Sequence, residues 1–253
     1  MRRGIFFAPF GELADPRVCA ELGARAEARG WDGVFLWDHM LYDDVDAIAD
    51  PWVAMAAIAA ATRTVRLGAM VTPVARRRPQ KLAREAATLD LLSGGRLICG
   101  LGLGGDRGGE LSRFGEELDP RARAALLDAG AELLDAWWRG EEAGGVRLLP
   151  RPAQRPRIPI WFAARWPNRR PVRRAARYDG LFTIELEHPD QLAEIVAEVD
   201  ALREAGSGTF DHVVTGAPGD DAAPWARAGA TWWLAGLSRH ATRAEAEAVI
   251  DGG

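Results

Sequence analysis

Residues 79–104 read PQKLAREAATLDLLSGGRLICGLGLG, and this stretch decides the fold class. Apolar side chains recur three or four residues apart at Leu82, Ala86 and Leu89, which is the spacing of an amphipathic helix. The glycine pair that follows predicts the end of this helix, because glycine takes the left-handed cap conformation without strain. Residues 96–101 then form a short apolar run that predicts a strand. The stretch is therefore a helix followed by a strand, which is the repeating unit of an α/β protein.

The same alternation extends from this stretch toward both ends of the sequence. Helices are predicted to begin at Asp15-Pro16 and at Asp50-Pro51, because aspartate caps a helix and proline is tolerated at its first position. Eight strand–helix units in 253 residues predict a closed (β/α)8 barrel rather than an open sheet. We therefore predict one α/β domain over residues 1–253, with short excursions near 105–119 and 144–157. The eight predicted strands are 5–8, 33–37, 65–71, 96–101, 158–163, 180–184, 212–215 and 230–234.

The composition excludes several classes of protein. The sequence has 32 basic and 36 acidic residues and a net charge of −4, which argues against a general nucleic-acid binder. With only Cys19 and Cys99 present, a disulfide-stapled secreted scaffold is excluded. No apolar run approaches the roughly 20 residues of a membrane span, and Glu12 and Asp15 cut short the apolar run near the beginning. We therefore expect a cytoplasmic protein with neither a membrane nor a nucleic-acid partner.

Asp38 and His39 directly follow the second predicted strand, where barrels of this kind carry their chemistry. A histidine titrates close to neutral pH, and a neighbouring carboxylate can orient its ring. Asp38 and His39 are therefore candidates for proton transfer. The alternative is a buried His–Asp pair that supports the loop, and the position alone does not decide between them.

The loop after the fourth predicted strand is rich in glycine. Residues 100–105 match G-x-G-x-x-G, the pattern of dinucleotide-binding folds. That fingerprint requires the last glycine to open a helix, whereas Gly105 is followed by Asp106 and by further loop residues. Two interpretations remain: a backbone that a flat ligand approaches closely, or a flexible loop without a ligand.

Residues 163–171, AARWPNRRP, follow the fifth predicted strand. Free backbone N–H groups at a helix start and arginine side chains both favour an anion, so Arg165, Arg169 and Arg170 indicate a phosphate site. The alternative is a solvated basic turn. Arginine supplies every basic residue of the chain except Lys81, and a GC-rich genome also explains this excess. The sequence contains no familiar metal or nucleophile motif, so we expect no metal.

The stretch from Leu82 onward is specific enough to name a family. It strongly resembles the A-x-x-A-x-T-L-D-x-L-S-G-G-R…G-x-G segment of the bacterial luciferase-like family, whose monooxygenases, reductases and dehydrogenases use flavin or the deazaflavin coenzyme F420. The resemblance implies a (β/α)8 barrel that binds FMN or F420 at the carboxyl ends of its strands. It continues, with the strand order preserved, at residues 33–39, 67–73, 159–180 and 229–234.

The resemblance also implies roles for individual residues. Asp38 and His39 match an Asp-His pair that, in the F420 branch, contacts the cofactor and takes part in proton transfer. Ala69 and Met70 match a segment behind the isoalloxazine ring that often contains a non-proline cis peptide, and we expect this bond between these two residues. Thr72 would hydrogen-bond the polar edge of the ring.

Two further loops are implied to hold the cofactor. The loop that flanks its ring and side chain contains Gly104, Gly105 and Asp106. The loop that receives its phosphate contains Ala163, Ala164, Arg165 and Trp166. Some F420 dehydrogenases of the family carry a catalytic glutamate where this sequence has Gly105, which argues against a sugar-phosphate dehydrogenase. One of the two excursions would have to cover the site, or the site stays open.

These observations favour a flavin-dependent monooxygenase, in which reduced FMN from a separate flavin reductase reacts with O2 and a small organic substrate is oxygenated. One alternative is an F420-dependent reductase or dehydrogenase in which His39 handles the proton. Another is a catalytically silent flavin-binding protein, and a hydrolase comes last because no metal ligands or nucleophile stand out. The family commonly dimerises through helices of the first half of the barrel, so the resemblance also implies a homodimer.

Overall fold

Every strand pair described in the sheet of this protein is parallel, because the segments that join paired strands return the chain to the same end of the sheet. The structure, a computed structural model, describes residues 1–204, 206 and 208–253. In these residues nine strands form one sheet in the order β3-β2-β1-β9-β8-β7-β6-β5-β4. The strands are β1 (Arg2–Phe7), β2 (Gly33–Leu36), β3 (Arg66–Ala69), β4 (Thr72–Pro73), β5 (Cys99–Gly102), β6 (Ile160–Arg165), β7 (Gly180–Ile184), β8 (Asp211–Gly216) and β9 (Trp232–Gly236).

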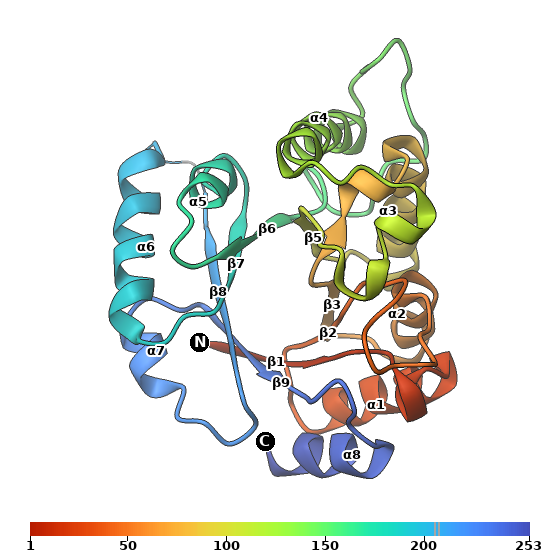
Figure 1. Ribbon diagram of the computed structural model, residues 1–253, viewed down its shortest axis with the longest axis vertical. Coiled ribbons are helices and arrows are strands. Elements are labelled where there is room, and N and C mark those ends of the chain that lie inside the picture. Colours follow the sequence, from red (N-terminus) through yellow and green to blue (C-terminus); the bar gives the residue numbers. More distant parts are fainter. Residues whose placement is uncertain (205, 207) are drawn as a thin grey trace.

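The helices lie around the outside of the curved sheet (Figure 1). They are α1 (Pro16–Ala28), α2 (Pro51–Ala61), α3 (Pro79–Ser93), α4 (Pro120–Arg139), α5 (Arg170–Ala175), α6 (Pro189–Leu202), α7 (Ala223–Arg227) and α8 (Arg243–Gly252). Asp15 and Asp50 cap α1 and α2 with their carboxylates, as predicted. Gly94 ends α3 in the left-handed conformation, with φ 70° and ψ 35°. None of the helices described is long and apolar enough to cross a bilayer.

β3 and β4 are two pieces of one barrel position. β3 pairs with β2, and β4 pairs with β5 on the other side. The free edge of β3 meets the segment just before β5, where Leu67 forms a parallel bridge with Leu97, so the sheet closes on itself. The nine strands therefore occupy eight positions, and the predicted luciferase-like (β/α)8 barrel is confirmed.

Two predictions about the third barrel position are wrong in detail. The strand predicted over 65–71 is interrupted, and the cis peptide bond joins Met70 to Val71 instead of Ala69 to Met70. The chain here lies so close to β5 that a Cβ atom on Gly100 would be only 2.2 Å from the carbonyl oxygen of Ala69. An apolar run in the sequence indicates that its side chains are buried. It does not indicate whether the backbone continues as one strand.

Aromatic rings fill the interior of the barrel near the amino ends of β6 and β9. The ring of Phe35 lies 5.7 Å from that of Trp161 and 5.5 Å from that of Trp232, and all three side chains are buried. This layer belongs to a cluster separate from the larger core between sheet and helices. This layer fills the interior at the amino ends of the strands. A ligand inside the barrel would therefore bind at the carboxyl ends.

Arg96, from the stretch quoted first, ties α2 and α3 to the barrel. Its guanidinium group is buried and donates to the carbonyl oxygens of Ala59 and Thr62 at the end of α2. It also donates to the carbonyl oxygens of Val65 and Ser93. A single side chain thus donates to carbonyl groups at the ends of two helices, which have no N–H partner within their own helix.

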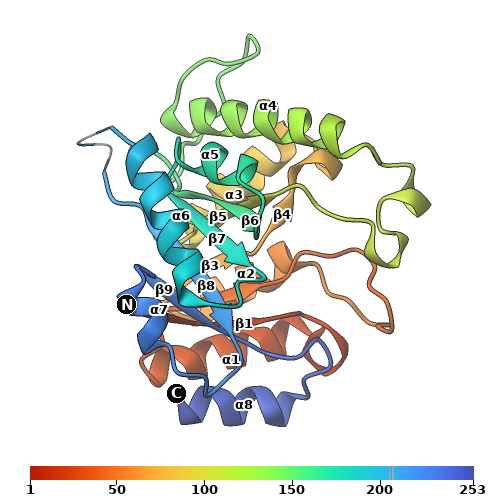
Figure 2. The same ribbon diagram turned by 60° about the vertical axis from the view of Figure 1, so that its left-hand side comes forward.

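The two excursions lie at opposite ends of the barrel. Residues 105–119 contain short 3-10 turns, η3 (Arg107–Gly109) and η4 (Ser112–Phe114), and follow the carboxyl end of β5. In the segment 144–157, Gln154 donates to the carbonyl oxygen of Leu97, which precedes β5, so this segment lies at the amino ends of the strands. Its first part projects beyond α4 (Figure 2). Only residues 105–119 are therefore placed to cover a site at the carboxyl ends.

Candidate functional site

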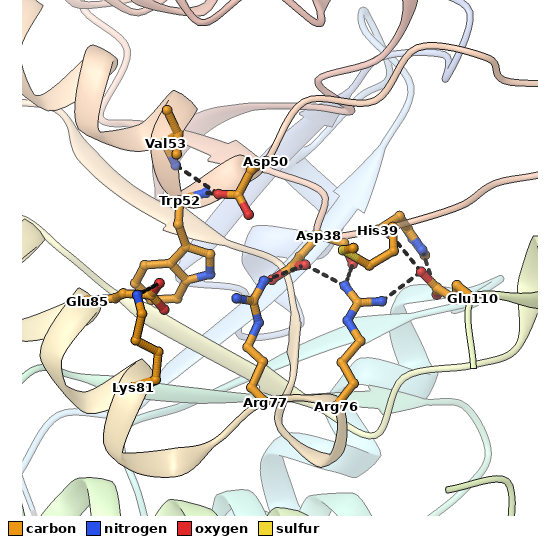
Figure 3. A network of polar contacts seen from close by, with 11 residues as sticks. Asp38, His39, Asp50, Trp52, Val53, Arg76, Arg77, Lys81, Glu85 and Glu110 are labelled. Carbon is orange, nitrogen blue, oxygen red and sulfur yellow. Dashed lines mark hydrogen bonds and ion pairs between the residues drawn. The ribbon is translucent and has the colours of Figure 1, made fainter. Parts of the chain in front are cut away.

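Three loops meet at the carboxyl ends of β2, β4 and β5 and bring charged side chains together (Figure 3). The loop after β2 begins with Trp37, Asp38 and His39. The 3-10 turn η2 (Val74–Arg76) follows β4 and carries Arg76, with Arg77 directly after it. The loop after β5 supplies Glu110. The site is thus assembled from segments that are far apart in the sequence.

Asp38 is held by two arginines. Nη2 of Arg76 donates to Oδ1 of Asp38 at 2.5 Å and to the Asp38 carbonyl oxygen at 2.9 Å. Nη2 of Arg77 donates to both carboxylate oxygens, at 2.8 and 3.0 Å. The carboxylate is only 1 % exposed, so Asp38 acts in this structure as the anchor of two arginines.

The ring of His39 is paired with Glu110. The adjacency of Asp38 and His39 in the sequence had suggested a pair between those two residues instead. Nδ1 of His39 lies 2.9 Å from Oε1 of Glu110. The other oxygen of Glu110 accepts from the backbone N–H of Met40 at 3.0 Å and from Nη1 of Arg76 at 2.7 Å. Burial raises the pKa of Glu110, but the bonds from His39, Met40 and Arg76 outweigh burial and hold this pKa below its usual range. Glu110 is therefore a carboxylate at neutral pH.

The charge on Glu110 fixes the tautomer of His39. A carboxylate only accepts hydrogen bonds, so Nδ1 of His39 must carry the hydrogen that it donates to Oε1. Nε2 is then the ring nitrogen that can exchange a proton with another molecule. The side chain of His39 is 26 % exposed, whereas that of Glu110 is 1 % exposed. The dyad therefore combines a buried anion with an accessible imidazole.

Aromatic rings surround the imidazole. The ring centroids of Tyr42, Trp37 and Phe10 lie 4.9, 5.9 and 6.3 Å from that of His39. Arg107, from the loop after β5, donates to the hydroxyl oxygen of Tyr42 at 2.8 Å. A flat or apolar organic molecule would find a suitable wall next to the proton-exchanging nitrogen.

The opening of the barrel at the carboxyl ends of the strands is called the mouth. The residues of the third barrel position lie directly beneath it. Ala69 and Met70 are buried, and Met70 contributes to the cluster inside the barrel. Thr72 is fully buried, and its hydroxyl group has no partner among the residues described. The indole N–H of Trp37 is likewise buried and lacks a partner within that part of the chain. Two orphaned polar atoms at the end of an otherwise apolar barrel fit a ligand with polar edges, as a flavin or deazaflavin ring has.

The glycine loop keeps the other side of the mouth open. A Cβ atom on Gly104, which has φ +71°, would lie 2.9 Å from the side chain of Pro73. A Cβ atom on Gly105 would meet nothing within 4 Å, so this position faces open space. The carboxylate of Asp106 accepts from the backbone N–H groups of Leu111 and Ser112, at 2.7 and 2.9 Å, and so shapes the loop.

The predicted phosphate loop is occupied by ion pairs. Arg165 pairs with Glu185 at 2.6 Å, and both side chains are largely exposed. Trp166 lies under the guanidinium group of Arg169, 4.4 Å from its ring centroid, and Arg169 pairs with Glu194. Ala163 is half-buried and Ala164 is buried in β6. An exposed pair such as Arg165–Glu185 contributes little to stability, and the phosphate-binding role of this loop stays a prediction.

A cavity of about 700 Å³ lies at the opposite end of the barrel and does not belong to this site. Its lining includes Arg157 and Arg203, which bind groups of the protein itself. Arg157 pairs with Asp179, and Arg203 donates to the carbonyl oxygens of Ala176 and Tyr178. Arg203 thus binds free carbonyl groups beyond the end of α5, whereas Arg157 is held by a carboxylate.

The architecture and the site can now be compared with known proteins. A family model described as luciferase-like monooxygenase matches residues 1–250. The chain belongs to this family. Solved structures with a similar fold include an F420-dependent enzyme as well as a monooxygenase.

Three similar proteins illustrate the range of the luciferase-like family. A phthiodiolone/phenolphthiodiolone dimycocerosates ketoreductase from Mycobacterium sp. (strain JLS) is 34 % identical over 192 residues, which are 70 % of this chain and 48 % of the relative. An F420-dependent secondary alcohol dehydrogenase in complex with an F420-acetone adduct has a TM-score of 0.78 at 17 % identity, covering 99 % of this chain and 96 % of that one. A monooxygenase from Streptomyces bottropensis has a TM-score of 0.69 at 26 % identity, covering 86 % and 71 %. The chain spans about half the length of the curated relatives it matches.

Sequence reasoning missed three members of the luciferase-like site. Arg76 and Arg77 belong to a run of three arginines just after the third predicted strand, a position that could have identified them. Glu110 lies in the predicted excursion 105–119, where no local pattern distinguishes it from Glu116 or Glu117. Its partnership with His39 depends on a contact across 71 residues.

Proposed function

We propose that this protein is an oxidoreductase that interconverts a ketone and a secondary alcohol with a deazaflavin of the F420 type, or with a flavin, as its hydride-carrying cofactor. The observation that carries the proposal is the His39–Glu110 dyad, an accessible imidazole held by a buried carboxylate at the mouth of the barrel. Reduction of a carbonyl group needs a proton at its oxygen as well as a hydride at its carbon. The dyad provides a group for that proton.

The residues around the mouth fit such a cofactor. Thr72 and Trp37 offer polar groups that lack protein partners in the described chain. Gly105 faces open space in which a flat ring could approach the backbone, and Arg165 would meet the phosphate. When bound, the deazaflavin or flavin ring supplies or accepts the hydride.

The protein's own part in the reaction is proton transfer, orientation and exclusion of water. As an imidazolium, His39 gives the proton on Nε2 to the substrate oxygen during reduction, and as the neutral Nδ1–H form it takes that proton back during oxidation. Glu110 keeps Nδ1 protonated and fixes the plane of the ring throughout. The rings of Phe10, Trp37 and Tyr42 hold the apolar part of the substrate beside Nε2.

The similar proteins support this choice of reaction. The curated relative named above as a ketoreductase matches 70 % of the chain. A secondary alcohol dehydrogenase, which acts on the reverse reaction, matches in fold over nearly the full length of both chains. The second candidate is a flavin monooxygenase, favoured by the description of the family model and by the monooxygenase that is 26 % identical.

Two measurements test the proposal. The purified protein is titrated with F420 and, separately, with FMN, and its tryptophan fluorescence is followed. Binding of one of them with Kd below about 100 μM, roughly −5.5 kcal/mol, is expected. The oxidation state of the bound cofactor is then followed by absorbance while ketones or secondary alcohols are supplied without O2. Failure of both cofactors to bind refutes the proposal, and turnover that requires O2 favours the monooxygenase.

A further inference from the structure

Arg76 and Arg77 are neighbours that bind the same carboxylate, but only one of them reaches the histidine dyad. Arg76 spans two carboxylates, with Nη2 on Asp38 and Nη1 on Glu110 at 2.5 and 2.7 Å. Arg77 contacts Asp38 through Nη2 alone, while its Cζ lies 6.0 Å from the ring centroid of Trp52 (Figure 3). The chain therefore contains two neighbouring arginines on one carboxylate, of which only Arg76 also binds Glu110 among the contacts described.

We propose that Arg76 is a positioning residue for His39, acting through Glu110, and that Asp38 serves to hold Arg76. The inference rests on the proposed function and deepens it. It names the residues that keep Nε2 of His39 as the ring nitrogen that exchanges a proton. Neither Arg76 nor Asp38 touches the substrate in this arrangement. Their side chains are 4 % and 1 % exposed.

Burial makes the Arg76 contact decisive for Glu110. Asp38, Arg76 and Glu110 form a chain of alternating charges away from water, and a buried carboxylate that loses its cation is strongly destabilised. Without Arg76, only the N–H of Met40 and the ring of His39 remain to hold Glu110. The carboxylate would then turn away or take up a proton, and in either case Nδ1 of His39 would lose its acceptor.

The shape of arginine makes the contact hard to replace. The two Nη atoms of Arg76 bind different carboxylates at the same time, which a planar fork permits and a single ammonium group at this position does not. Arg77 uses one nitrogen on the two oxygens of one carboxylate, and an ammonium group can take over that role. A lysine is therefore expected to substitute for Arg77 but not for Arg76.

The first test uses the free protein and needs no cofactor. Histidine labelled with 15N reports which ring nitrogen carries the hydrogen, and the His39 signals are assigned from their loss in His39→Gln. The wild type is expected to show the Nδ1–H form of His39. Arg76→Lys and Arg76→Met are expected to shift it toward Nε2–H, whereas Arg77→Lys keeps the wild-type signal. Equal effects at both arginines, or no effect at Arg76, overturn the inference.

Glu110→Gln keeps the inference testable if an Arg76 variant fails to fold. The amide has the size of the carboxylate but can donate to Nδ1, so this variant is expected to shift His39 toward the Nε2–H form. Folding of each variant is checked by circular dichroism. An unchanged tautomer in a folded Glu110→Gln protein rejects the role of Glu110, and with it the role of Arg76.

The second test separates positioning from binding once a substrate has been found. Arg76→Lys is expected to lower kcat roughly 10- to 100-fold, since small misplacements of a catalytic group have effects of this size. KM and the cofactor Kd should stay close to the wild-type values. A rise in KM at unchanged kcat contradicts positioning. If no cofactor binds, the proposed function fails while the tautomer measurement still decides the role of Arg76.

Discussion

Oε1 of Glu110 lies 2.9 Å from Nδ1 of His39, although the two residues are 71 positions apart in the chain. The relationship gives His39 a carboxylate partner that its neighbour Asp38 cannot be, because Asp38 is bound to Arg76 and Arg77. The pair also places a carboxylate in the mouth. The resemblance implied that some relatives carry a glutamate at the position where this chain has Gly105. The acid of the site comes from five residues further along the same loop.

Replacing His39 should separate chemistry from binding. His39→Gln removes the proton-exchanging nitrogen and is expected to lower kcat about 100-fold, as is typical of general acid catalysis. The Kd for the cofactor, measured by fluorescence quenching, should change little, because the ring is one contact among many. A large drop in the free energy of unfolding with little loss of turnover per folded molecule would show that His39 is structural.

Filling the open space at Gly105 should block the cofactor without disturbing the fold. Gly105→Leu places a side chain where a Cβ would meet nothing within 4 Å. The free energy of unfolding should stay within about 0.5 kcal/mol of the wild type, while the Kd for F420 or FMN rises at least about tenfold, or 1.4 kcal/mol. Gly252→Leu is the matched control, since Gly252 also faces open space but lies in α8. Equal affinity in both variants would place the cofactor elsewhere.

Replacing Arg96 should destabilise the whole barrel. Arg96→Met removes a buried donor to the carbonyl oxygens of Ala59 and Ser93, at the ends of α2 and α3, and a loss of about 3 kcal/mol in the free energy of unfolding is expected. Urea denaturation measures this loss. The control Arg63→Met removes an exposed arginine and should change stability by less than about 0.5 kcal/mol. Similar values for the two variants would mean that the Arg96 contacts contribute little.

His212 should make stability depend on pH. Burial lowers the pKa of His212 from 6.5 to about 4, with a small opposing contribution from Asp200 and a reinforcing one from Arg203. Between these values the unfolded chain binds a proton that the folded protein excludes, so the histidine's contribution to stability falls as the pH falls from 6.5 to 4. The full effect is about 3 kcal/mol.

The effect of His212 is measured by comparing urea denaturation of the wild type and of His212→Phe at several pH values. The phenylalanine is close in shape and cannot take up a proton. Stability of the variant should therefore fall less steeply below pH 6.5 than stability of the wild type. Parallel curves for the two proteins would show that His212 is protonated without cost in the folded state.

Local signals predicted the barrel well because each is satisfied by nearby atoms. Asp15 and Asp50 cap helices whose N–H groups are two or three residues away, and Gly94 ends a helix through its own backbone. The site was predicted only in part. His39 was found from its place after a strand, but Glu110 was not, because the bond that defines its role joins two loops. The interruption after Ala69 was missed for a related reason, since buried apolar residues look alike whether or not their backbone continues as a strand.

The place of Lys81 has a practical consequence. It is the one lysine in the 253 residues, and both cysteines are buried. Lys81 lies in the first turn of α3, where it pairs with Glu85 beside the arginines of the mouth (Figure 3), and its side chain is 69 % exposed. An amine-reactive dye would therefore attach to one side chain, at the entrance to the barrel, and otherwise only to the exposed α-amino group of Met1. A fluorophore there would report the arrival of a light-absorbing ligand directly, by energy transfer, in a protein that has had no residue altered.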